Sequence, residues 1–490
     1  MMSQQCKCRL AGTVVLLLVI CSGCMRYGRP YRSDYLRKDP PTQLCEDHPK
    51  NLSTKSVWCP APEAPYYLAF IEFDDFGELY DPGQLTRALR IIEKAKSSSP
   101  TGNAKVITFI HGWKNNASDA TGNVWGFRDA LKDLAKHYGG EENEPIVGVY
   151  IGWRGAVTNL RVIKEFTFFN RKNAAIRIAG ANLTEAINQV INTSKQCLQE
   201  CGGDSPRGPG SLTVVVGHSF GGMVLERSVT KAIVGDILEQ EAERKNCVRK
   251  RRYWREKNEE SSHTEEITAC QEREKGIRPR ADLIALVNEA APATEARQLL
   301  GFLQRHRVKL VVDGASAPLI LSITSAGDAA TGVAFPIGQY PSKLTKALRH
   351  YNDTAPPDMP ISQQSTYYLH TTGHLPPLFS HLVGKRQDQS IREVLDPLGP
   401  EEEKRYCYSS TANQGQVYCV VPAPKAFNTS AYWVMQMPTE IVPDHSTIFR
   451  PIFAELLRHF VAARVNTEKL HKPAKPALLQ PGEAEPQTPE

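Results

Sequence analysis

The sequence lacks a strong net charge, internal repeats and a long apolar run, the features that mark highly charged, repeat and membrane-spanning proteins. Its 490 residues carry a formal net charge of only +6, an excess that by itself does not indicate a nucleic-acid partner. It has no internal repeat and no apolar run of about 18 residues, the length typical of a membrane-spanning helix. Hydrophobic residues make up 41% and charged residues 23%, as in soluble globular proteins. At an average of about 150 residues per domain, the length of the chain predicts two to three domains. Fewer are expected if one α/β domain carries insertions.

The longest apolar stretch lies near the N-terminus, where Leu10–Ile20 follows Lys7 and Arg9. About eleven residues is too short to cross a bilayer but suits the apolar region of a secretory signal. The segment that ends in Cys24 resembles the lipobox of bacterial lipoproteins, in which this cysteine is lipidated, although Cys21 stands where leucine is preferred. We predict a signal peptide over residues 1–23, export, and lipidation of Cys24. A simple cleaved signal and a short membrane anchor are the alternatives.

Eight cysteines remain beyond Cys24, and they fall into four couples of sequence neighbours: Cys45 and Cys59, Cys197 and Cys201, Cys247 and Cys270, Cys407 and Cys419. An even set of this kind favours local disulfides in an oxidising compartment, although spacing alone leaves the connectivity open. Zinc is the rival interpretation. It is disfavoured because none of these couples has two-residue spacing or a suitably placed histidine.

Apolar strand patterns alternate with amphipathic helix patterns from residue 64 onward. Predicted strands lie at residues 66–73, 105–110, 146–151, 212–216, 283–287, 308–312, 319–324 and 433–437. Predicted helices lie at 84–95, 124–137, 174–197, 223–239 and 448–465. The alternation and the runs of Val, Ile and Leu predict an α/β fold, with a mainly parallel central sheet and helices on both faces.

Several segments interrupt this alternation, and they define the predicted domain organisation. The order is a tether over residues 24–62, a first core part over 63–345 with a charged helical insertion at about 240–280, a cap or lid insertion over 346–430, a second core part over 431–465, and a disordered tail over 466–490. The charged insertion contains the basic run 249–252. Glutamates on both sides favour a solvated helical extension over a site for anionic lipid or nucleic acid.

The stretch VVVGHSFGG at residues 214–222 places Ser219 between a predicted strand and a predicted helix. The flanking glycines permit a tight turn, which would hold the hydroxyl clear of the sheet at the positive end of the helix. A serine is a weak nucleophile and needs a base that is oriented by a third group. A glycine-rich structural turn is the alternative, so an acid and a histidine at later strand ends would support the nucleophile.

Both groups are present. Asp328 follows the strand at 319–324, and His445 lies between the last strand and the last helix, so the order is Ser, Asp, His. We predict that Ser219 attacks, His445 transfers the proton and Asp328 orients the imidazole. Glu289 and Asp444 remain alternatives for the acid, as do His370, His374 and His381 for the base. A zinc site at these three histidines is disfavoured because Thr, Gly and Pro surround them, and we predict no metal.

Three segments together carry a family resemblance: Phe109-Ile110-His111-Gly112-Trp113, Val147-Gly148-Val149-Tyr150-Ile151-Gly152-Trp153-Arg154-Gly155 and Gly217-His218-Ser219-Phe220-Gly221-Gly222. Their order and spacing resemble the α/β-hydrolase superfamily over about residues 64–345 and 430–465, in particular serine hydrolases with a His-Gly-Trp loop. The resemblance implies an α/β-hydrolase fold and an oxyanion hole made by the backbone N–H groups of Trp113 and Phe220. His111 would hold the loop. The long gap between Asp328 and His445 implies a cap.

Trp153 and Arg154 follow the strand at 146–151, where they would line the acyl or leaving-group pocket. A packed tryptophan beside a surface arginine is the alternative. The predicted function is an exported, lipid-anchored serine esterase that needs no cofactor and acts on a small-molecule or lipid ester. A catalytically silent scaffold that binds an envelope partner, and a peptidase or amidase with the same triad, remain alternatives.

The predicted location is the bacterial cell envelope, with secretion as the alternative. Sequons at Asn51, Asn182 and Asn428 would matter in a eukaryotic secretory pathway. Another sequon, at Asn116, lies beside the predicted oxyanion loop, where a glycan would obstruct the site. That position favours a bacterial protein.

Overall fold

The computed structural model describes most of the chain. The described residues are 29–33, 44–45, 54–62, 64–138, 144–155, 168–196, 211–257, 260–264, 266–268, 270, 279–308, 310–312, 315–348, 363–399, 403–404, 406–424, 426 and 430–470. The predicted signal peptide and lipidation site, one cysteine couple and two sequons lie outside these residues: residues 1–23, Cys24, Cys197, Cys201, Asn51 and Asn428.

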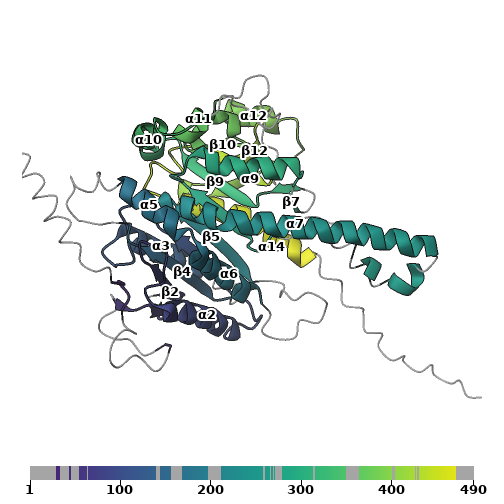
Figure 1. Cartoon of the computed structure of the whole chain (residues 1–490), viewed down its shortest axis with the longest axis horizontal. Helices are drawn as coiled ribbons and strands as arrows, with labels where there is room; N and C mark the ends of the chain where they lie inside the picture. The colour runs from purple at the N-terminus through teal and green to yellow at the C-terminus, as the bar shows by residue number, and fades with distance from the viewer. Residues whose placement is uncertain are drawn as a thin grey trace, which may run out of the picture.

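An eight-stranded, mostly parallel sheet forms the centre of the molecule (Figure 1). Its order is β1-β2-β4-β3-β5-β6-β9-β13, and only the β1–β2 pair is antiparallel. The strands are β1 Val57–Trp58, β2 Tyr67–Phe73, β3 Lys105–Ile110, β4 Ile146–Trp153, β5 Leu212–His218, β6 Leu283–Val287, β9 Ile320–Ser325 and β13 Tyr432–Met437. The predicted α/β class with a mainly parallel sheet is therefore confirmed.

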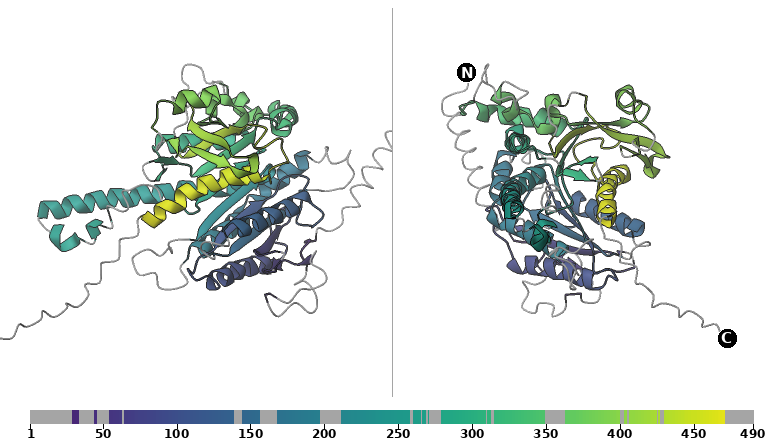
Figure 2. Two further views of the ribbon diagram at one scale, coloured as in Figure 1. Left: turned by 180° about the vertical axis from the view of Figure 1, so that it is seen from behind. Right: turned by 90° about the vertical axis from the view of Figure 1, so that its right-hand side faces the viewer.

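Helices cover both faces of this sheet (Figure 2). They are α2 Pro82–Ser97, α3 Gly122–Tyr138, α5 Phe168–Ile178, α6 Ala181–Lys195, α7 Phe220–Lys257, α9 Ala293–Arg305 and α14 Pro451–Leu470. The strands alternate between two apolar cores, since Ala69 and Ile71 of β2 pack with one cluster while Leu68 and Phe70 pack with the other. Burial on both faces explains the continuous apolar runs in the sequence.

The strand order creates a switch point between β3 and β5. The chain continues from β3 through α3 to β4 on one side, and from β5 through α7 to β6 on the other. In open α/β sheets, ligands bind in the crevice outside the carboxyl ends of the strands at such a point. The loops that follow Ile110 and His218 lie there.

The structure corrects several predicted elements. The predicted strand at 308–312 is not in the main sheet, because β7 Leu310–Val312 pairs with β8 Ala315–Ala317 in a short hairpin while β9 occupies the place beside β6. The predicted helix at 174–197 is two helices, α5 and α6, separated by extended backbone at Gly180. Strand β1 lies within the predicted tether, and α14 continues past residue 465 to Leu470.

The segment predicted as a cap forms a small sheet of its own, with the order β10-β12-β11. Its elements are α11 Gln364–Leu369, β10 His381–Lys385, α12 Gln389–Leu395, β11 Cys407–Ser410 and β12 Gln416–Pro422. It packs beside the edge strand β13, where the Ser380 N–H donates to the Val434 carbonyl at 2.9 Å. Whether it shapes access to a site stays a prediction.

Among the described residues, three disulfides join sequence neighbours: Cys45–Cys59, Cys247–Cys270 and Cys407–Cys419. The prediction of local disulfides is confirmed for these couples. The charged segment after residue 240 is largely a continuation of α7, which extends well beyond the body of the molecule (Figure 1). Within the described part of the chain, we find no helix with the length and apolarity needed to cross a bilayer.

Candidate active site

Ser219 lies in the turn between β5 and α7, with a backbone φ of +58° that few non-glycine residues adopt. Neighbouring segments hold this strained turn in place. The Ser219 N–H donates to the Val287 carbonyl at 3.0 Å, and the Ala290 N–H donates to the Ser219 carbonyl at 3.1 Å. At Gly221, an added Cβ would collide with the carbonyl oxygens of Ile110 and His111. The start of α7 can therefore pack closely against the end of β3 only with glycine there.

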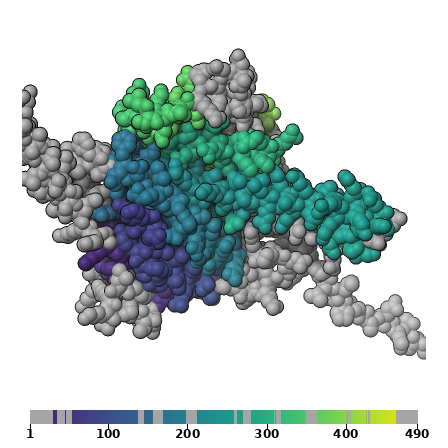
Figure 3. Space-filling view, in the orientation of Figure 1, coloured from purple at the N-terminus to yellow at the C-terminus, as the bar shows by residue number. Residues whose placement is uncertain are grey.

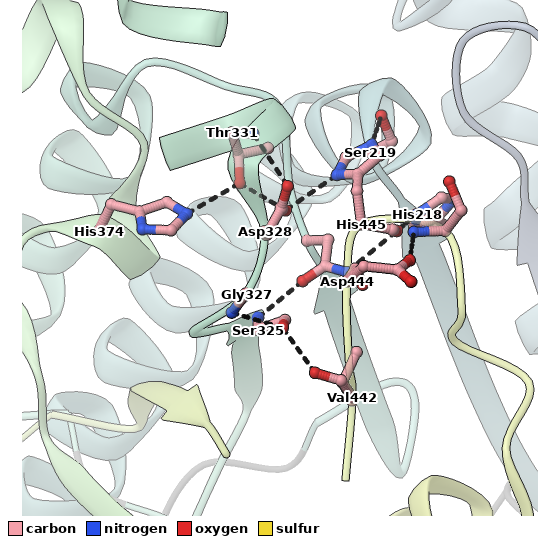
Figure 4. Close-up of polar contacts among 12 residues, drawn as sticks. His218, Ser219, Ser325, Gly327, Asp328, Thr331, His374, Val442, Asp444 and His445 are labelled. Carbon is pink, nitrogen blue, oxygen red and sulfur yellow. Dashed lines mark hydrogen bonds and ion pairs between the residues drawn. The ribbon is translucent and has the colours of Figure 1, made fainter. Parts of the chain in front are cut away.

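A continuous chain of hydrogen bonds joins Ser219, His445 and Asp328 (Figure 4). His445 Nε2 lies 2.8 Å from Ser219 Oγ, and His445 Nδ1 lies 2.8 Å from Asp328 Oδ2. Because a carboxylate only accepts, Nδ1 carries the proton and Nε2 accepts from the serine hydroxyl. The three residues follow the carboxyl ends of β5, β13 and β9, so the structure brings the predicted trio together.

Asp328 is held as an ionised acceptor by three donors. The Thr331 N–H donates to Oδ1 at 3.0 Å, the Thr331 hydroxyl donates to Oδ2 at 2.5 Å, and His445 supplies the third bond. Burial alone would raise the pKa of Asp328, but the bonds from His445 and Thr331 outweigh it and hold the pKa below its usual value. Asp328 is therefore negative at neutral pH, the form that orients an imidazole.

The loop that carries His445 is fixed by two side chains, those of His218 and Asn288, to which the sequence assigned no role. His218 donates from Nε2 to the His445 carbonyl at 2.7 Å. Asn288 donates from Nδ2 to the carbonyls of Asp444 and His445, each at 3.0 Å, and its Oδ1 accepts from the Ser325 N–H at 2.8 Å. Each residue lies at the end of a strand, next to a residue that the sequence had proposed for the site. That position was the one feature of the sequence that could have identified them.

Thr331 also connects Asp328 to the insertion. Its hydroxyl proton goes to Asp328, so its oxygen accepts from His374 Nε2 at 3.0 Å (Figure 4). Burial lowers the pKa of His374, which favours the neutral ring. Of the three rival histidines, His381 stacks on Trp433 with 3.6 Å between ring centroids, and the carbonyl of His370 accepts from the Ala293 N–H. His374 reaches the site, but its partner there is Thr331.

The loop after β3 lies directly against Ser219. A Cβ added at Gly112 would stand 2.5 Å from the Ser219 Cβ and 2.8 Å from the His218 carbonyl oxygen. Glycine therefore permits the close approach that an oxyanion hole needs. Phe220 is the first residue of α7, so its backbone N–H has no acceptor within the helix. The donor roles of Trp113 and Phe220 stay predictions.

His111 and Trp153 lock this loop to the end of β4. His111 Nε2 accepts from the Trp153 N–H at 3.0 Å, the Trp153 indole donates to the His111 carbonyl at 2.8 Å, and the two rings stack. Complete burial lowers the pKa of His111 to about 4. Trp153 is only 1% exposed, which agrees with the alternative that this tryptophan is packed in the core. Arg154 is half-buried, and its carbonyl accepts from Arg171. A pocket role for Trp153 and Arg154 stays a prediction.

The two rival acids have other partners. The Asp444 carboxylate is exposed and accepts from the backbone N–H groups of Ser446 and Thr447 at 2.7 and 2.9 Å. Glu289 is buried, and burial together with the nearby Glu226 raises its pKa well above the usual value. The bond from His445 Nδ1 goes to Asp328 rather than to either rival.

The arrangement supplies the parts of an activated nucleophile. A serine hydroxyl that is bonded to an imidazole, itself bonded to a carboxylate, can lose its proton as it attacks an electrophilic carbon. Among the residues that the structure describes, no group of three or more His, Cys, Asp or Glu side chains is arranged to hold a metal ion. Comparison with protein-family models, curated proteins and solved structures finds no match to the chain.

Proposed function

We propose that the protein is a serine hydrolase of the α/β-hydrolase superfamily that cleaves carboxylic esters. The observation that carries the proposal is the hydrogen-bond chain from Ser219 through His445 to Asp328, at the carboxyl end of the sheet. Strain in the backbone of Ser219 adds support, because such strain concentrates at functional sites. The order of the three residues along the chain also agrees with that of α/β-hydrolases.

The reaction follows from the positions of the protons. Ser219 Oγ attacks the acyl carbon and passes its proton to His445 Nε2, while Asp328 stabilises the imidazolium that forms. The oxyanion faces the backbone N–H groups of Trp113 and Phe220, where loss of one donor typically lowers the rate about a hundredfold or more. His445 then protonates the leaving alkoxide, and the alcohol departs. His445 then deprotonates a water molecule that attacks the acyl-enzyme, and it passes this proton to Ser219 Oγ as the acid is released and the free serine is restored.

The proposed location is the bacterial cell envelope, with a lipid anchor at Cys24. The three disulfides fit an oxidising compartment, and the N-terminal sequence supplies the export signal and the lipidated cysteine. Radiolabelled palmitate should enter the wild-type protein and not the Cys24→Ser variant. Equal incorporation into both would contradict the anchor.

Turnover of soluble substrates tests the activity. We expect the wild type to hydrolyse short-chain esters, Ser219→Ala to lose the activity, and Ser446→Ala to retain it. Ser446 is the matched control because it is an exposed serine next to His445. Thioesters and peptides in the same panel define the acyl class. Turnover of no substrate, or equal turnover by wild type and Ser219→Ala, would contradict the proposal.

A further inference from the structure

The helical stretch that follows Asp328 presents its apolar side to solvent. It consists of η4 Ala330–Ala334 and α10 Phe335–Lys343, which are continuous. Four large apolar residues along it and at its C-cap, at intervals of three or four, are exposed: Val333 at 59%, Ile337 at 68%, Tyr340 at 55% and the C-cap Leu344 at 76%. This spacing places them on one face, which we call the apolar stripe. The opposite face buries Thr331, Phe335 and Gln339, two of which are polar.

The charge pattern around the apolar stripe is one-sided. Residues 329–342 contain no charged side chain, and residues 329–348 contain no Asp or Glu. Lys343 and Lys346 follow at the C-terminal end. A surface helix of a globular protein normally turns charged residues toward water, and a contiguous exposed apolar patch marks an interaction surface.

The apolar stripe is continuous with the candidate active site. Thr331, on the buried face of this helix, bonds to Asp328. Helix α5 lies alongside, since Lys172 Nζ donates to Gln339 Oε1 at 2.6 Å, and the two segments are neighbours on the surface (Figure 3). Phe169 of α5 is itself 45% exposed.

Aromatic rings connect this surface to the oxyanion loop. Phe168 packs against Phe335 at a centroid distance of 6.2 Å and against Trp113 at 5.5 Å. Phe168 also packs against Phe220, the residue after Ser219, at 5.4 Å. An apolar path therefore runs from the residues beside Ser219 to the exposed helix.

Arg32 docks at the carboxyl end of the sheet, the end at which η4 follows β9. Arg32 is buried, its guanidinium donates to Asp119 at 2.7 Å and to the Ala117 carbonyl at 2.8 Å, and its N–H donates to Glu72 at 2.8 Å. Glu72 lies at the carboxyl end of β2, and Ala117 and Asp119 follow β3. Arg32 lies eight positions after Cys24, a reach of at most about 28 Å when the chain is extended. A lipid on Cys24 would hold the carboxyl end of the sheet close to a membrane.

We propose that the apolar stripe docks on an anionic phospholipid surface and brings the Ser219 site to lipid esters at that surface. The second part rests on the proposed function. The apolar side chains would enter the boundary between headgroups and acyl chains, as they do in amphipathic interfacial helices. Lys343 and Lys346 would meet the lipid phosphates, for which the absence of Asp and Glu nearby leaves no competing partner within residues 329–348.

Vesicle flotation tests the docking with the full chain in a Cys24→Ser background, so that no attached lipid contributes. We expect Ile337→Glu to weaken binding to phosphatidylcholine–phosphatidylglycerol vesicles by at least about tenfold, because a charge would replace an apolar side chain that enters the lipid on docking. Val248→Glu is the matched control. Val248 is 44% exposed on the distant part of α7, and the substitution introduces the same charge there. It should bind as the parent does.

Three results would overturn the docking: equal binding by Ile337→Glu and Val248→Glu, equal binding to vesicles of phosphatidylcholine alone, or a dimer that Ile337→Glu dissociates with vesicle binding unchanged. The last result would assign the stripe to a second copy of the chain.

Two ester assays separate this inference from the proposed function. Ile337→Glu should hydrolyse a soluble short-chain ester at the parent rate and a phospholipid ester in vesicles at least about tenfold more slowly. If no variant hydrolyses any ester, the proposed function fails while the flotation result still decides the docking. If both substrates slow equally, the stripe has no special role at a lipid surface.

Discussion

Replacement of Asp328 by asparagine keeps the shape of the side chain but changes which atoms accept hydrogen bonds. The Thr331 N–H donates to Oδ1, so the amide oxygen must take that position, and the NH₂ group then faces His445 Nδ1 at the present Oδ2 position. Because NH₂ donates, Nδ1 must give up its proton. The ring then carries its proton on Nε2, where it faces Ser219 and cannot accept the hydroxyl proton.

The expected loss follows from the bonds at Oδ2. Two donors, His445 and Thr331, bond there to the charged oxygen, and each such bond contributes about 1.5–3 kcal/mol. Loss of both gives about 3–6 kcal/mol, or roughly 10²- to 10⁴-fold in rate. We place Asp328→Asn at the upper end, about 10⁴-fold in kcat, since the wrong tautomer also removes the base.

Steady-state hydrolysis of a soluble ester measures this loss, and Asp444→Asn is the matched control. Asp444 is the residue next to His445, and its exposed carboxylate accepts from Ser446 and Thr447, bonds that an asparagine oxygen can retain. The control should stay within about threefold of wild type, as expected for a surface substitution. The assigned acid would be wrong if Asp328→Asn kept more than about a tenth of the wild-type activity. It would also be wrong if Asp444→Asn lost more activity than Asp328→Asn.

Three further predictions concern the surroundings of Ser219. Gly112→Ala would place a Cβ 2.5 Å from the Ser219 Cβ, so the loop must move and kcat/KM should fall at least about a hundredfold; unchanged kinetics would contradict the close approach. Asn288→Ala removes the two hydrogen bonds that the Asn288 side chain donates to the His445 loop, and it should lower the free energy of unfolding in urea by about 1–3 kcal/mol; an unchanged value would contradict this role of Asn288. Burial raises the pKa of Glu226 from 4.5 to about 7, so the folded state binds this proton more tightly, and the resulting stability, complete below pH 4.5, is lost as the pH rises through about 7. Glu226→Gln should flatten the dependence of the urea midpoint on pH across that window, and an unchanged slope would refute the raised pKa of Glu226.

The sequence predicts Ser219, Asp328 and His445 because each depends on local pattern. A glycine-flanked serine between a strand and a helix is a short-range feature, and the two partners lie just after apolar strand patterns. The prediction that residues 308–312 form a strand of the main sheet is wrong for the same reason, its dependence on local pattern alone. Its apolar run resembles a sheet strand locally, yet the chain turns back on itself at β8.

The supporting residues could not be found this way, because their contacts join distant parts of the chain. His218 bonds to a carbonyl 227 positions away, and Asn288 to one 157 positions away. Thr331 and His374 meet across 43 positions, from two segments with no shared pattern. Hydrophobic periodicity describes one element at a time and does not say which loops will meet.

The stretch 330–344 illustrates another limit. Residues 331, 335 and 339 have helical spacing, and so do residues 333, 337, 340 and 344, so two faces compete. Hydrophobicity alone favours burial of the second set, but the structure buries the first. Thr331 lies on the buried side because its hydroxyl bonds to Asp328, a tertiary contact that overrides the pattern.

The measurement that tests the central claim most directly is labelling by a fluorophosphonate, followed by peptide mapping. The phosphorus is attacked readily by a serine whose proton is removed as it attacks, and an unactivated serine is a weak nucleophile. We predict one adduct per chain, on the peptide that contains Ser219, absent from Ser219→Ala and retained in Ser446→Ala. An unlabelled wild type, an adduct on another residue, or equal labelling of Ser219→Ala would contradict an activated Ser219.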